Sequence, residues 1–444
     1  MEKRNQWASR LGFVLATAGA AIGLGNLWKF PYLMGKNGGF RFLTAYLIFV
    51  VILGIPVMIM EMSIGRYTQQ SPVNAFRSLN KKTTIIGGMG VLSAFIILSY
   101  YSVIGGWLLK YIASYITTFS APVDFNAYAA TAGEPIFWHF VFMACAAFVC
   151  YKGTAGIEKA SRIMMPGLFI LIVIIIVRSL TLPGAKAGLE FMFFPKSEEG
   201  RFDLNFIVAA LGQVFYSLSL CMGITITFGS YLKKQEDIPK NCLLVAGLDT
   251  MMALCAGLAI FPAVFSFGLE PTQGASLVFG TLPKVFDALG GGVIFAILFF
   301  ILLFFAALTS SIALLECIVS FAMDDLHWGR SKSVIVLAVL SFLLGVPSSL
   351  AFGATSDFLI LNYNFFDLMG MLTDNILMPI GGIFMCIYVG WIWGPQKLIQ
   401  EIEQGSVTFR LKKAWVICIR FITPLLIAVV TVMGFLNIYN IIKA

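Results

Sequence analysis

The sequence has few charged residues for its length, and this scarcity excludes an ordinary soluble protein. Asp, Glu, Lys and Arg make up 12% of the 444 residues, against roughly 25% in soluble domains. Hydrophobic residues account for 59%, and the mean hydropathy is +0.90. The composition therefore predicts a protein that crosses a membrane many times. We attribute the formal net charge of +8 to Lys and Arg in cytoplasmic loops, and not to nucleic-acid binding.

The sequence also lacks the side-chain patterns of most enzymes and metal centres. It has two histidines, His139 and His327, both near the ends of predicted spans, and we interpret them as interfacial residues. There is no H-E-x-x-H or G-x-S-x-G pattern, so an intramembrane enzyme is not predicted. The eight cysteines form no C-x-x-C pair, which argues against a disulfide framework or a soft-metal site.

Apolar runs of about 20 residues or more predict membrane-spanning helices. The predicted fold class is an all-α polytopic membrane protein, and eleven such runs are present. They cover residues 10–35, 42–68, 85–118, 136–152, 163–181, 205–231, 241–268, 292–323, 333–352, 360–391 and 414–440.

The loop charges predict an orientation in a cell membrane. Lys and Arg gather before the first span and after spans 2, 4, 6, 8 and 10, whereas the other loops carry acidic residues. Because basic loops stay in the cytoplasm, the N-terminus is predicted to be cytoplasmic. An odd number of spans then places the C-terminus outside. The loop 270–292 is long and semi-apolar, and it is either a simple connector or a segment that folds back over an extracellular opening.

The first span contradicts the pattern of a plain membrane anchor. Gly19, Gly23, Gly25 and Asn26 lie in its middle and Pro31 follows, although glycine costs about 1 kcal/mol against alanine inside a helix. Irregular backbone at membrane depth is tolerated where it lines a cavity, and broken helices form substrate and ion sites in secondary transporters. The sixth span is similarly interrupted at SLSLCMG. Two breaks five spans apart are consistent with halves that are inverted in the membrane.

Polar residues inside the predicted spans indicate what such a site binds. Most offer neutral oxygens, which suit a hard cation such as Na⁺, and the freed N–H groups at Leu24 and Gly25 begin a half-helix that suits a carboxylate. The simpler interpretations stay open: hydroxyls and tyrosines that pack between helices, Gly19-x-x-x-Gly23 as a packing motif, and Glu61 as a cap for a broken neighbour. The polar residues are Asn26, Tyr46, Glu61, Tyr100, Tyr101, Gln213, Tyr216, Ser217, Ser219, Asp249, Thr309, Ser310 and Ser311.

Five ordered motifs across the whole chain resemble the neurotransmitter:sodium symporter family, in particular its bacterial amino-acid transporters. They are GAAIGLGNLWKFPY, GIPVMIMEMSIGRY, SYYSVIGGW, GQVFYSLSLCMG and FFAALTSSIA. The resemblance implies the fold of the bacterial leucine transporter, with alternating access and sodium-coupled amino-acid import. It implies one transporter domain (1–444) with inverted repeats over 1–181 (helices 1–5) and 200–391 (helices 6–10), followed by helix 11 at 412–440.

The resemblance also implies site residues at matching positions. The first of two Na⁺ sites would use Ala21, Asn26, Ser217 and Asp249, and the second would use Gly19, Ile22, Ala306, Thr309 and Ser310. The substrate would contact Ala21, Leu24, Gly25, Ile97, Tyr101, Tyr216, Ser217, Ser219, Met222, Ser310 and Leu314. The outer gate would pair Lys29 with Asp367, and the inner gate would use Arg4, Trp7, Tyr231 and Asp324.

The chain departs from the family pattern at four places. Lys29 replaces an arginine, so the outer gate should close more loosely. Asp249 replaces an asparagine, and we predict that its fixed negative charge makes chloride unnecessary. Cys221-Met222-Gly223 replaces a common Gly-Phe-Gly, which predicts room for tryptophan, tyrosine or leucine side chains. The usual twelfth helix is missing, so a dimer built on it is not predicted and the oligomeric state is left open. A sensor without transport, or a carrier of another zwitterion, is the alternative.

Overall fold

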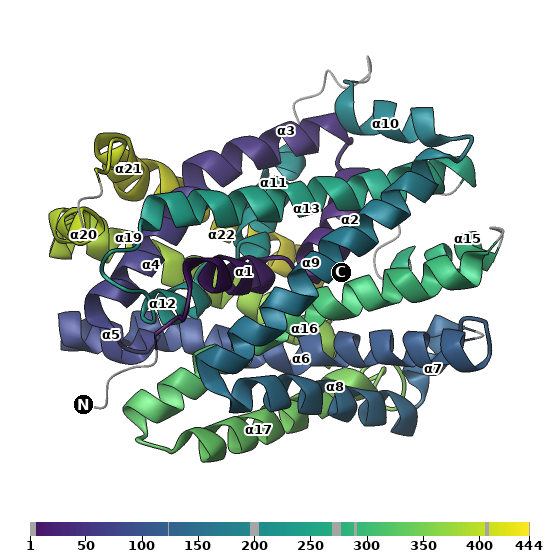
Figure 1. The fold of residues 1–444 in the computed structure, drawn as a ribbon, viewed down its shortest axis with the longest axis horizontal. Helices are drawn as coiled ribbons and strands as arrows, with labels where there is room; N and C mark the ends of the chain where they lie inside the picture. The colour runs from purple at the N-terminus through teal and green to yellow at the C-terminus, as the bar shows by residue number, and fades with distance from the viewer. Residues whose placement is uncertain are drawn as a thin grey trace.

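The computed structural model describes residues 6–122, 124–195, 204–268, 277–287, 291–404 and 408–443, and in these ranges the protein is built from helices. Figure 1 shows the long helices lying side by side, with α5, α20 and α21 at one end of the bundle and α7, α10 and α15 at the other. The first five predicted spans correspond to α1 (Arg10–Ala21), η1 (Gly25–Lys29) and α2 (Phe30–Lys36); α3 (Phe40–Phe49), η2 (Val50–Gly54) and α4 (Ile55–Thr68); α6 (Thr84–Thr117); α8 (Gly133–Tyr151); and α9 (Gly153–Leu180).

The remaining predicted spans follow the same order. They correspond to α11 (Leu204–Ser217) and α12 (Ile224–Gly229); α13 (Ile238–Ser266); α16 (Gly292–Asp325); α17 (Arg330–Leu350); α18 (Phe365–Met371), η5 (Leu372–Leu377), α19 (Met378–Ile387) and η6 (Tyr388–Trp393); and α21 (Lys412–Ile417), η8 (Cys418–Ile422) and α22 (Thr423–Lys443). Short connecting helices are α5 (Pro72–Leu79), η3 (Lys81–Thr83), α7 (Phe125–Ala130), α10 (Ala185–Phe193), η4 (Leu277–Thr281), α15 (Leu282–Asp287) and α20 (Gln396–Ile402).

The all-α membrane architecture is confirmed. Among the described residues, nine helices are long and apolar enough to cross a membrane, and a tenth results if the bent pair Arg10–Ala21 and Gly25–Lys36 is one span. The sixth predicted span is divided between α11 and α12, each of which is too short to cross alone. The count of eleven therefore stays a prediction.

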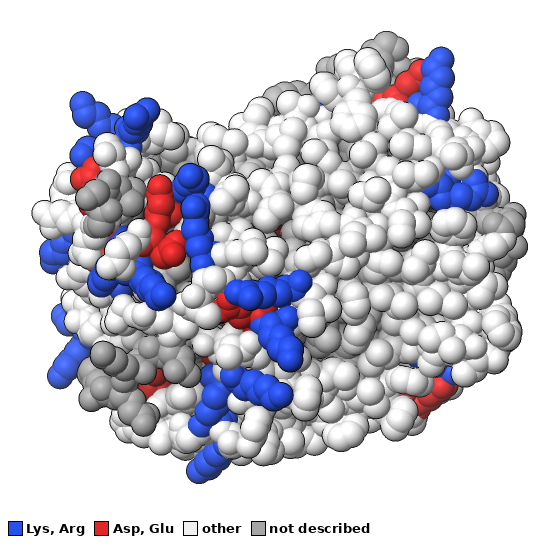
Figure 2. All heavy atoms as spheres, in the orientation of Figure 1, with Lys and Arg blue, Asp and Glu red and all other residues white. Residues whose placement is uncertain are grey.

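Charged side chains gather at one end of the bundle. Figure 2 shows Lys and Arg concentrated over the end that holds α5, α20 and α21 and reaching the centre of the visible face, while a broad band to the right of the centre is almost free of charge. An uncharged belt of this kind suits the hydrocarbon core of a bilayer. The basic end fits the predicted cytoplasmic side, and the orientation stays a prediction.

The described part of the loop 270–292 folds back onto the helices. Phe279 in η4 packs against Trp107 and Phe125, with ring centroids 5.7 and 5.0 Å away, and its carbonyl accepts a hydrogen bond from the Tyr111 hydroxyl at 2.7 Å. Trp28, next to Lys29 of helix 1, lies 6.0 Å from the Phe279 ring. These contacts favour the predicted fold-back over a simple connector for residues 277–287.

The interpretation of His139 as an interfacial residue was wrong. Its side chain is fully buried between α6, α8 and α17, and its Nε2 lies 2.8 Å from the Ser102 hydroxyl. Gly345 permits this packing, since a Cβ there would stand 2.5 Å from the His139 ring. The position of His139 near the end of an apolar run gave no sign of the small residues that surround it on neighbouring helices.

Candidate transport site

The first helix is broken where its glycines predicted. Residues 22–24 separate α1 from η1, and the two halves differ in direction by 49°. Gly23 lies in the break because a side chain does not fit there: a Cβ would stand 2.6 Å from the Ser310 hydroxyl oxygen and 2.8 Å from that of Tyr101. The break is narrower than the sequence predicted, since Gly19 still belongs to α1 and Asn26 to η1.

The sixth helix is broken over residues 218–223. Ser219, Cys221 and Gly223 have φ values of 51°, 62° and 75°, which lie in the left-handed region that a helix cannot use. Glu61 caps this break: its carboxylate accepts hydrogen bonds from the Cys221 amide at 3.1 Å and the Thr225 hydroxyl at 2.6 Å. The interpretation of Glu61 as a cap for a broken neighbour is therefore the one the structure supports.

A small cavity lies where the two breaks face α6 and α16. Its lining contains nine of the predicted substrate residues and adds Ala20, Gly23 and Ile224, which the sequence reasoning missed. The full lining is Ala20, Ala21, Gly23, Gly25, Ile97, Tyr101, Tyr216, Ser219, Met222, Ile224, Ser310 and Leu314. Ile224 is the first residue after the break. Its position directly after Gly223 could have predicted that it lines the cavity.

The lining of this cavity combines polar groups with apolar side chains. The Leu24 amide donates to the Tyr101 hydroxyl at 3.0 Å, and the Ser219 hydroxyl donates to the Ala20 carbonyl at 3.0 Å. Ile97, Met222 and Leu314 supply the apolar surface, and all three are at most 3% exposed. A ligand that carries both polar groups and an apolar side chain matches such a lining.

Asp249 of α13 lies at the centre of a fully buried hydrogen-bond cluster beside the cavity. Its carboxylate accepts from the Asn26 amide at 2.8 Å, the Ser217 hydroxyl at 2.7 Å and the Tyr46 hydroxyl at 3.3 Å. The Asn26 Nδ2 group also donates to the Ser217 hydroxyl at 3.0 Å. Tyr46 and Ser217 bring hydroxyl oxygens to this carboxylate, and oxygens of this kind suit a hard monovalent cation. Asn26 presents its Nδ2 amide group to the carboxylate, while its Oδ1 accepts from the Gly23 amide at 3.2 Å. Ala21, the remaining predicted ligand, lies in the cavity lining next to it.

The residues predicted for a second cation also come together. The Ser310 hydroxyl lies 3.4 Å from the Gly19 carbonyl oxygen, and a Cβ on Gly19 would stand 3.2 Å from the Thr309 Cβ. Thr309 donates to the Ala306 carbonyl at 3.0 Å. Ile22 is the residue that ends α1, where backbone carbonyls lose their helical partners. These groups are neutral oxygens from α1 and α16.

The predicted outer ion pair has a different partner in the structure. Lys29 lies 3.0 Å from Asp374 and 4.0 Å from the centre of the Tyr216 ring, whereas Asp367 accepts a hydrogen bond from Asn364. The pairing of Lys29 with Asp367 was therefore wrong for this structure. Asp374 lies seven residues, or about two helical turns, further along helix 10. That places it on the same face as Asp367 but deeper, within reach of the Lys29 side chain.

At the predicted inner gate, the structure has an aromatic contact between Trp7 and Tyr231. Trp7 donates its indole N–H to the Phe228 carbonyl at 3.1 Å, and its ring lies 5.9 Å from the ring of Tyr231. Asp324, at the end of α16, accepts from the Ser71 amide at 2.6 Å. Arg4 lies outside the described residues. The structure thus brings Trp7 and Tyr231 together and gives Asp324 a contact with the start of α5.

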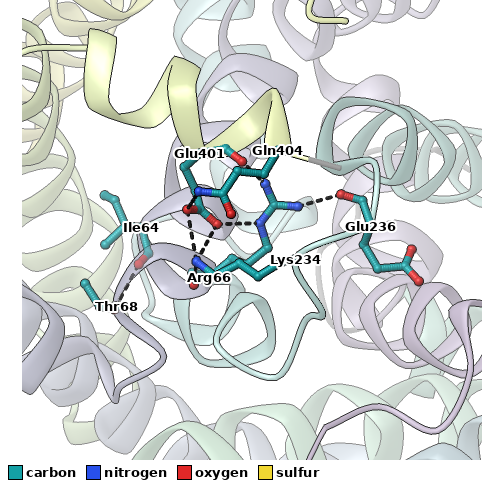
Figure 3. Close-up of polar contacts among 7 residues, drawn as sticks. All are labelled: Ile64, Arg66, Thr68, Lys234, Glu236, Glu401 and Gln404. Carbon is teal, nitrogen blue, oxygen red and sulfur yellow. Dashed lines mark hydrogen bonds and ion pairs between the residues drawn. The ribbon is translucent and has the colours of Figure 1, made fainter. Parts of the chain in front are cut away.

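A buried ion network joins several helix ends on this side. Figure 3 shows Arg66 of α4 between Glu401 of α20 and the loop after α12. The Arg66 Nε lies 2.8 Å from a Glu401 carboxylate oxygen, and both side chains are at most 1% exposed. Lys234 reaches the same carboxylate at 2.9 Å, and Arg66 also donates to the Glu236 carbonyl at 2.5 Å. Glu236 in turn lies 3.9 Å from Arg10 at the start of helix 1.

Comparison with known proteins identifies the group to which this architecture belongs. The sodium:neurotransmitter symporter family matches residues 4–125 and 125–442. The chain belongs to this family. Among its relatives is the uncharacterised sodium-dependent transporter YhdH of Bacillus subtilis, which is 37% identical over 453 residues, covering 100% of this chain and 99% of that protein. A sodium-dependent transporter of Haemophilus influenzae is 35% identical over 450 residues, with 97% and 98% coverage.

A solved structure and a more distant relative extend the comparison. The crystal structure of MhsT in complex with L-phenylalanine superimposes with a TM-score of 0.90 and 41% identity, covering 97% of this chain and all of that one. The sodium- and chloride-dependent GABA transporter ine of Drosophila melanogaster is 26% identical over 502 residues, which span 99% of this chain and 52% of that protein. The family consists of transporters, and this chain is therefore a sodium-dependent membrane transporter with the leucine-transporter fold.

Proposed function

We propose that this symporter imports hydrophobic and aromatic L-amino acids, such as tryptophan, tyrosine and leucine, together with Na⁺ at two sites and without chloride. The observation that carries the proposal is the cavity at the two helix breaks. Its lining holds the Tyr101 hydroxyl, which accepts from the Leu24 amide, together with apolar side chains. The Asp249 cluster reaches Asn26, which follows the lining residue Gly25 in the chain. MhsT, which shares the fold, was crystallised with L-phenylalanine.

The charges of the site support an amino-acid zwitterion. Leu24 and Gly25 lie at the start of the second half of helix 1, where N–H groups without a partner inside the helix and the helix dipole favour a carboxylate. The Ala20 carbonyl and the hydroxyl of Ser219 offer oxygens to an ammonium group. A first Na⁺ held by Asn26, Ser217 and Asp249 would lie near the substrate carboxylate, so each ligand would raise the affinity for the other.

Sodium would drive transport by favouring one conformation of the protein when it binds and another when it leaves. Na⁺ at Gly19, Thr309 and Ser310 would hold α1 against α16 and favour the outward-facing state. When this Na⁺ leaves for the cytoplasm, the contact of Trp7 with Phe228 and Tyr231 would open, and the substrate would be released on that side. Inward movement of one charge is worth about 2.3 kcal/mol per 100 mV.

Uptake into liposomes tests the transport activity directly. Purified protein should accumulate labelled tryptophan or leucine when Na⁺ is outside and K⁺ inside, and should not do so when choline replaces Na⁺. Binding in detergent without accumulation in liposomes would instead indicate a sensor. Accumulation that hydrophobic amino acids fail to inhibit, but another zwitterion inhibits, would contradict the proposed substrate class.

Tyr101→Phe should weaken substrate binding by about ten- to a hundredfold. The change removes the hydroxyl that meets the Leu24 amide, and hydrogen bonds to charged groups contribute about 1.5–3 kcal/mol. Equilibrium binding of labelled substrate measures the effect. Tyr100→Phe on the same helix serves as the control, because Tyr100 does not line the cavity. Equal losses in both variants would argue against carboxylate binding at Tyr101.

Met222→Phe should shift selectivity toward smaller side chains. Met222 lines the cavity and is 3% exposed, and a rigid ring there would fill space that the flexible thioether leaves open. Competition uptake with tryptophan, leucine and alanine measures the order of preference. Met222→Leu keeps the volume and should leave the order unchanged. An unchanged order in Met222→Phe would show that residue 222 does not set the substrate size.

A further inference from the structure

Arg420 is a charged residue on the lipid side of the last predicted span. It lies in η8, and its Nε donates to the Gly390 carbonyl of the neighbouring η6 at 2.7 Å. The guanidinium lies 5.5 Å from the centre of the Trp391 ring. No carboxylate in the part of the chain that the structure describes forms an ion pair with it.

The side chains around Arg420 face outward and are apolar. Trp391, Ile417 and Phe421 are 56%, 53% and 55% exposed. In a membrane protein this surface is covered by lipid and not by water. A charged group in such surroundings needs an anionic or polar partner, because its desolvation is expensive.

Two π-helical turns hold the guanidinium in place. Arg420 lies in η8 and Gly390 in η6, and π turns free backbone carbonyls from the regular helical pattern. Gly390 allows the close approach, since a Cβ there would stand 3.1 Å from the Arg420 Cγ. The Trp391 indole N–H donates to the Arg420 carbonyl at 3.3 Å, and the Trp391 and Phe421 rings meet edge to face at 5.2 Å. With Nε committed to Gly390, the two terminal nitrogens remain for another acceptor.

The level of this cluster along the helix matches the edge of the hydrocarbon core. Helix 10 ends at Gly394, where φ is +90°, so Trp391 lies in its last turn. Tryptophan favours the level of the lipid headgroups. Lys397, just beyond, lies over the Trp393 ring at 5.4 Å.

We propose that Arg420 and Trp391 form a binding site for the phosphate of an anionic phospholipid. The terminal nitrogens of the guanidinium match a phosphate in a two-point hydrogen bond, and Trp391, Ile417 and Phe421 would contact the upper part of the acyl chains. A net-negative headgroup such as phosphatidylglycerol is favoured over phosphatidylcholine, whose ammonium group repels the arginine. One arginine at the membrane surface corresponds to about a fivefold preference.

Quenching of Trp391 fluorescence by brominated lipid tests this site. The protein is reconstituted in vesicles with equal mole fractions of either brominated phosphatidylglycerol or brominated phosphatidylcholine. The chain has eight tryptophans, so the signal of Trp391 is taken as the difference between the protein and its Trp391→Phe variant. We expect about a fivefold stronger apparent association of phosphatidylglycerol, which Arg420→Gln abolishes. Arg420→Lys, which keeps the charge but loses the fork, should retain about a twofold preference.

Lys413→Gln is the matched control, because Lys413 is an exposed cation seven residues before Arg420 in the same span, and no described contact joins it to Trp391. It should leave the preference unchanged. Equal quenching of Trp391 by the two lipids in the unaltered protein would overturn the proposal, as would a preference that survives in Arg420→Gln. Absence of quenching by either lipid, together with a dimer in size-exclusion chromatography, would show that a second copy of the chain covers this surface and would also overturn it. If Arg420→Gln fails to fold, the comparison of Arg420→Lys with Lys413→Gln decides the outcome.

Discussion

Asp249→Asn should lower the apparent affinity for Na⁺ by tenfold or more and make uptake respond to chloride. The change removes a buried negative charge that accepts hydrogen bonds from Asn26, Ser217 and Tyr46. A unit charge about 4 Å away contributes up to about 4 kcal/mol at the effective dielectric constant near a protein surface, and 1.4 kcal/mol already gives tenfold. The hydroxyls of Tyr46 and Ser217 would then be available to a halide ion.

Uptake by purified protein in liposomes measures both effects. The unaltered protein should transport equally well when gluconate replaces chloride, whereas the variant should regain part of its activity with chloride. Asp357→Asn, which changes an exposed carboxylate between α17 and α18, serves as the control. Loss of uptake by the unaltered protein in gluconate would show that Asp249 does not replace chloride. Unchanged Na⁺ dependence in Asp249→Asn would remove this residue from the cation site.

Glu401→Ala should destabilise the protein by about 3–5 kcal/mol, because it leaves a buried arginine without its counter-charge. Arg66 is fully buried and has its closest acidic partner in Glu401 (Figure 3). We expect the midpoint of thermal unfolding in detergent to fall by several degrees. Replacing both residues by methionine should restore part of that loss, since well-packed apolar side chains often substitute for a buried ion pair.

Glu403→Ala is the matched control for this prediction. Glu403 lies two residues further along and pairs with Lys412 at 3.0 Å, but both side chains are partly exposed. Exposed ion pairs contribute little to stability, so the unfolding midpoint should not change measurably. Similar midpoints for Glu401→Ala and Glu403→Ala would mean that the Arg66 network does not stabilise the fold.

The sequence by itself determined the fold class, the family and the positions of both helix breaks. Hydropathy is a local property, so runs such as 85–118 and 292–323 predicted α6 and α16 directly. Glycine and polar residues inside apolar runs are costly, and for that reason Gly23 and the segment around Cys221 marked where the helices open. Motif matching added nine of the twelve residues that line the cavity.

Tertiary structure alone decided which side chains meet. The partner of Lys29 depends on how far its flexible chain reaches along helix 10, and two turns of that helix separate Asp367 from Asp374. The burial of His139 depends on small residues of other helices, and the Arg66–Glu401 pair joins residues 335 positions apart. Periodicity and composition report the environment along one helix. Contacts between helices depend on their rotation and depth in the bundle, which no local pattern records.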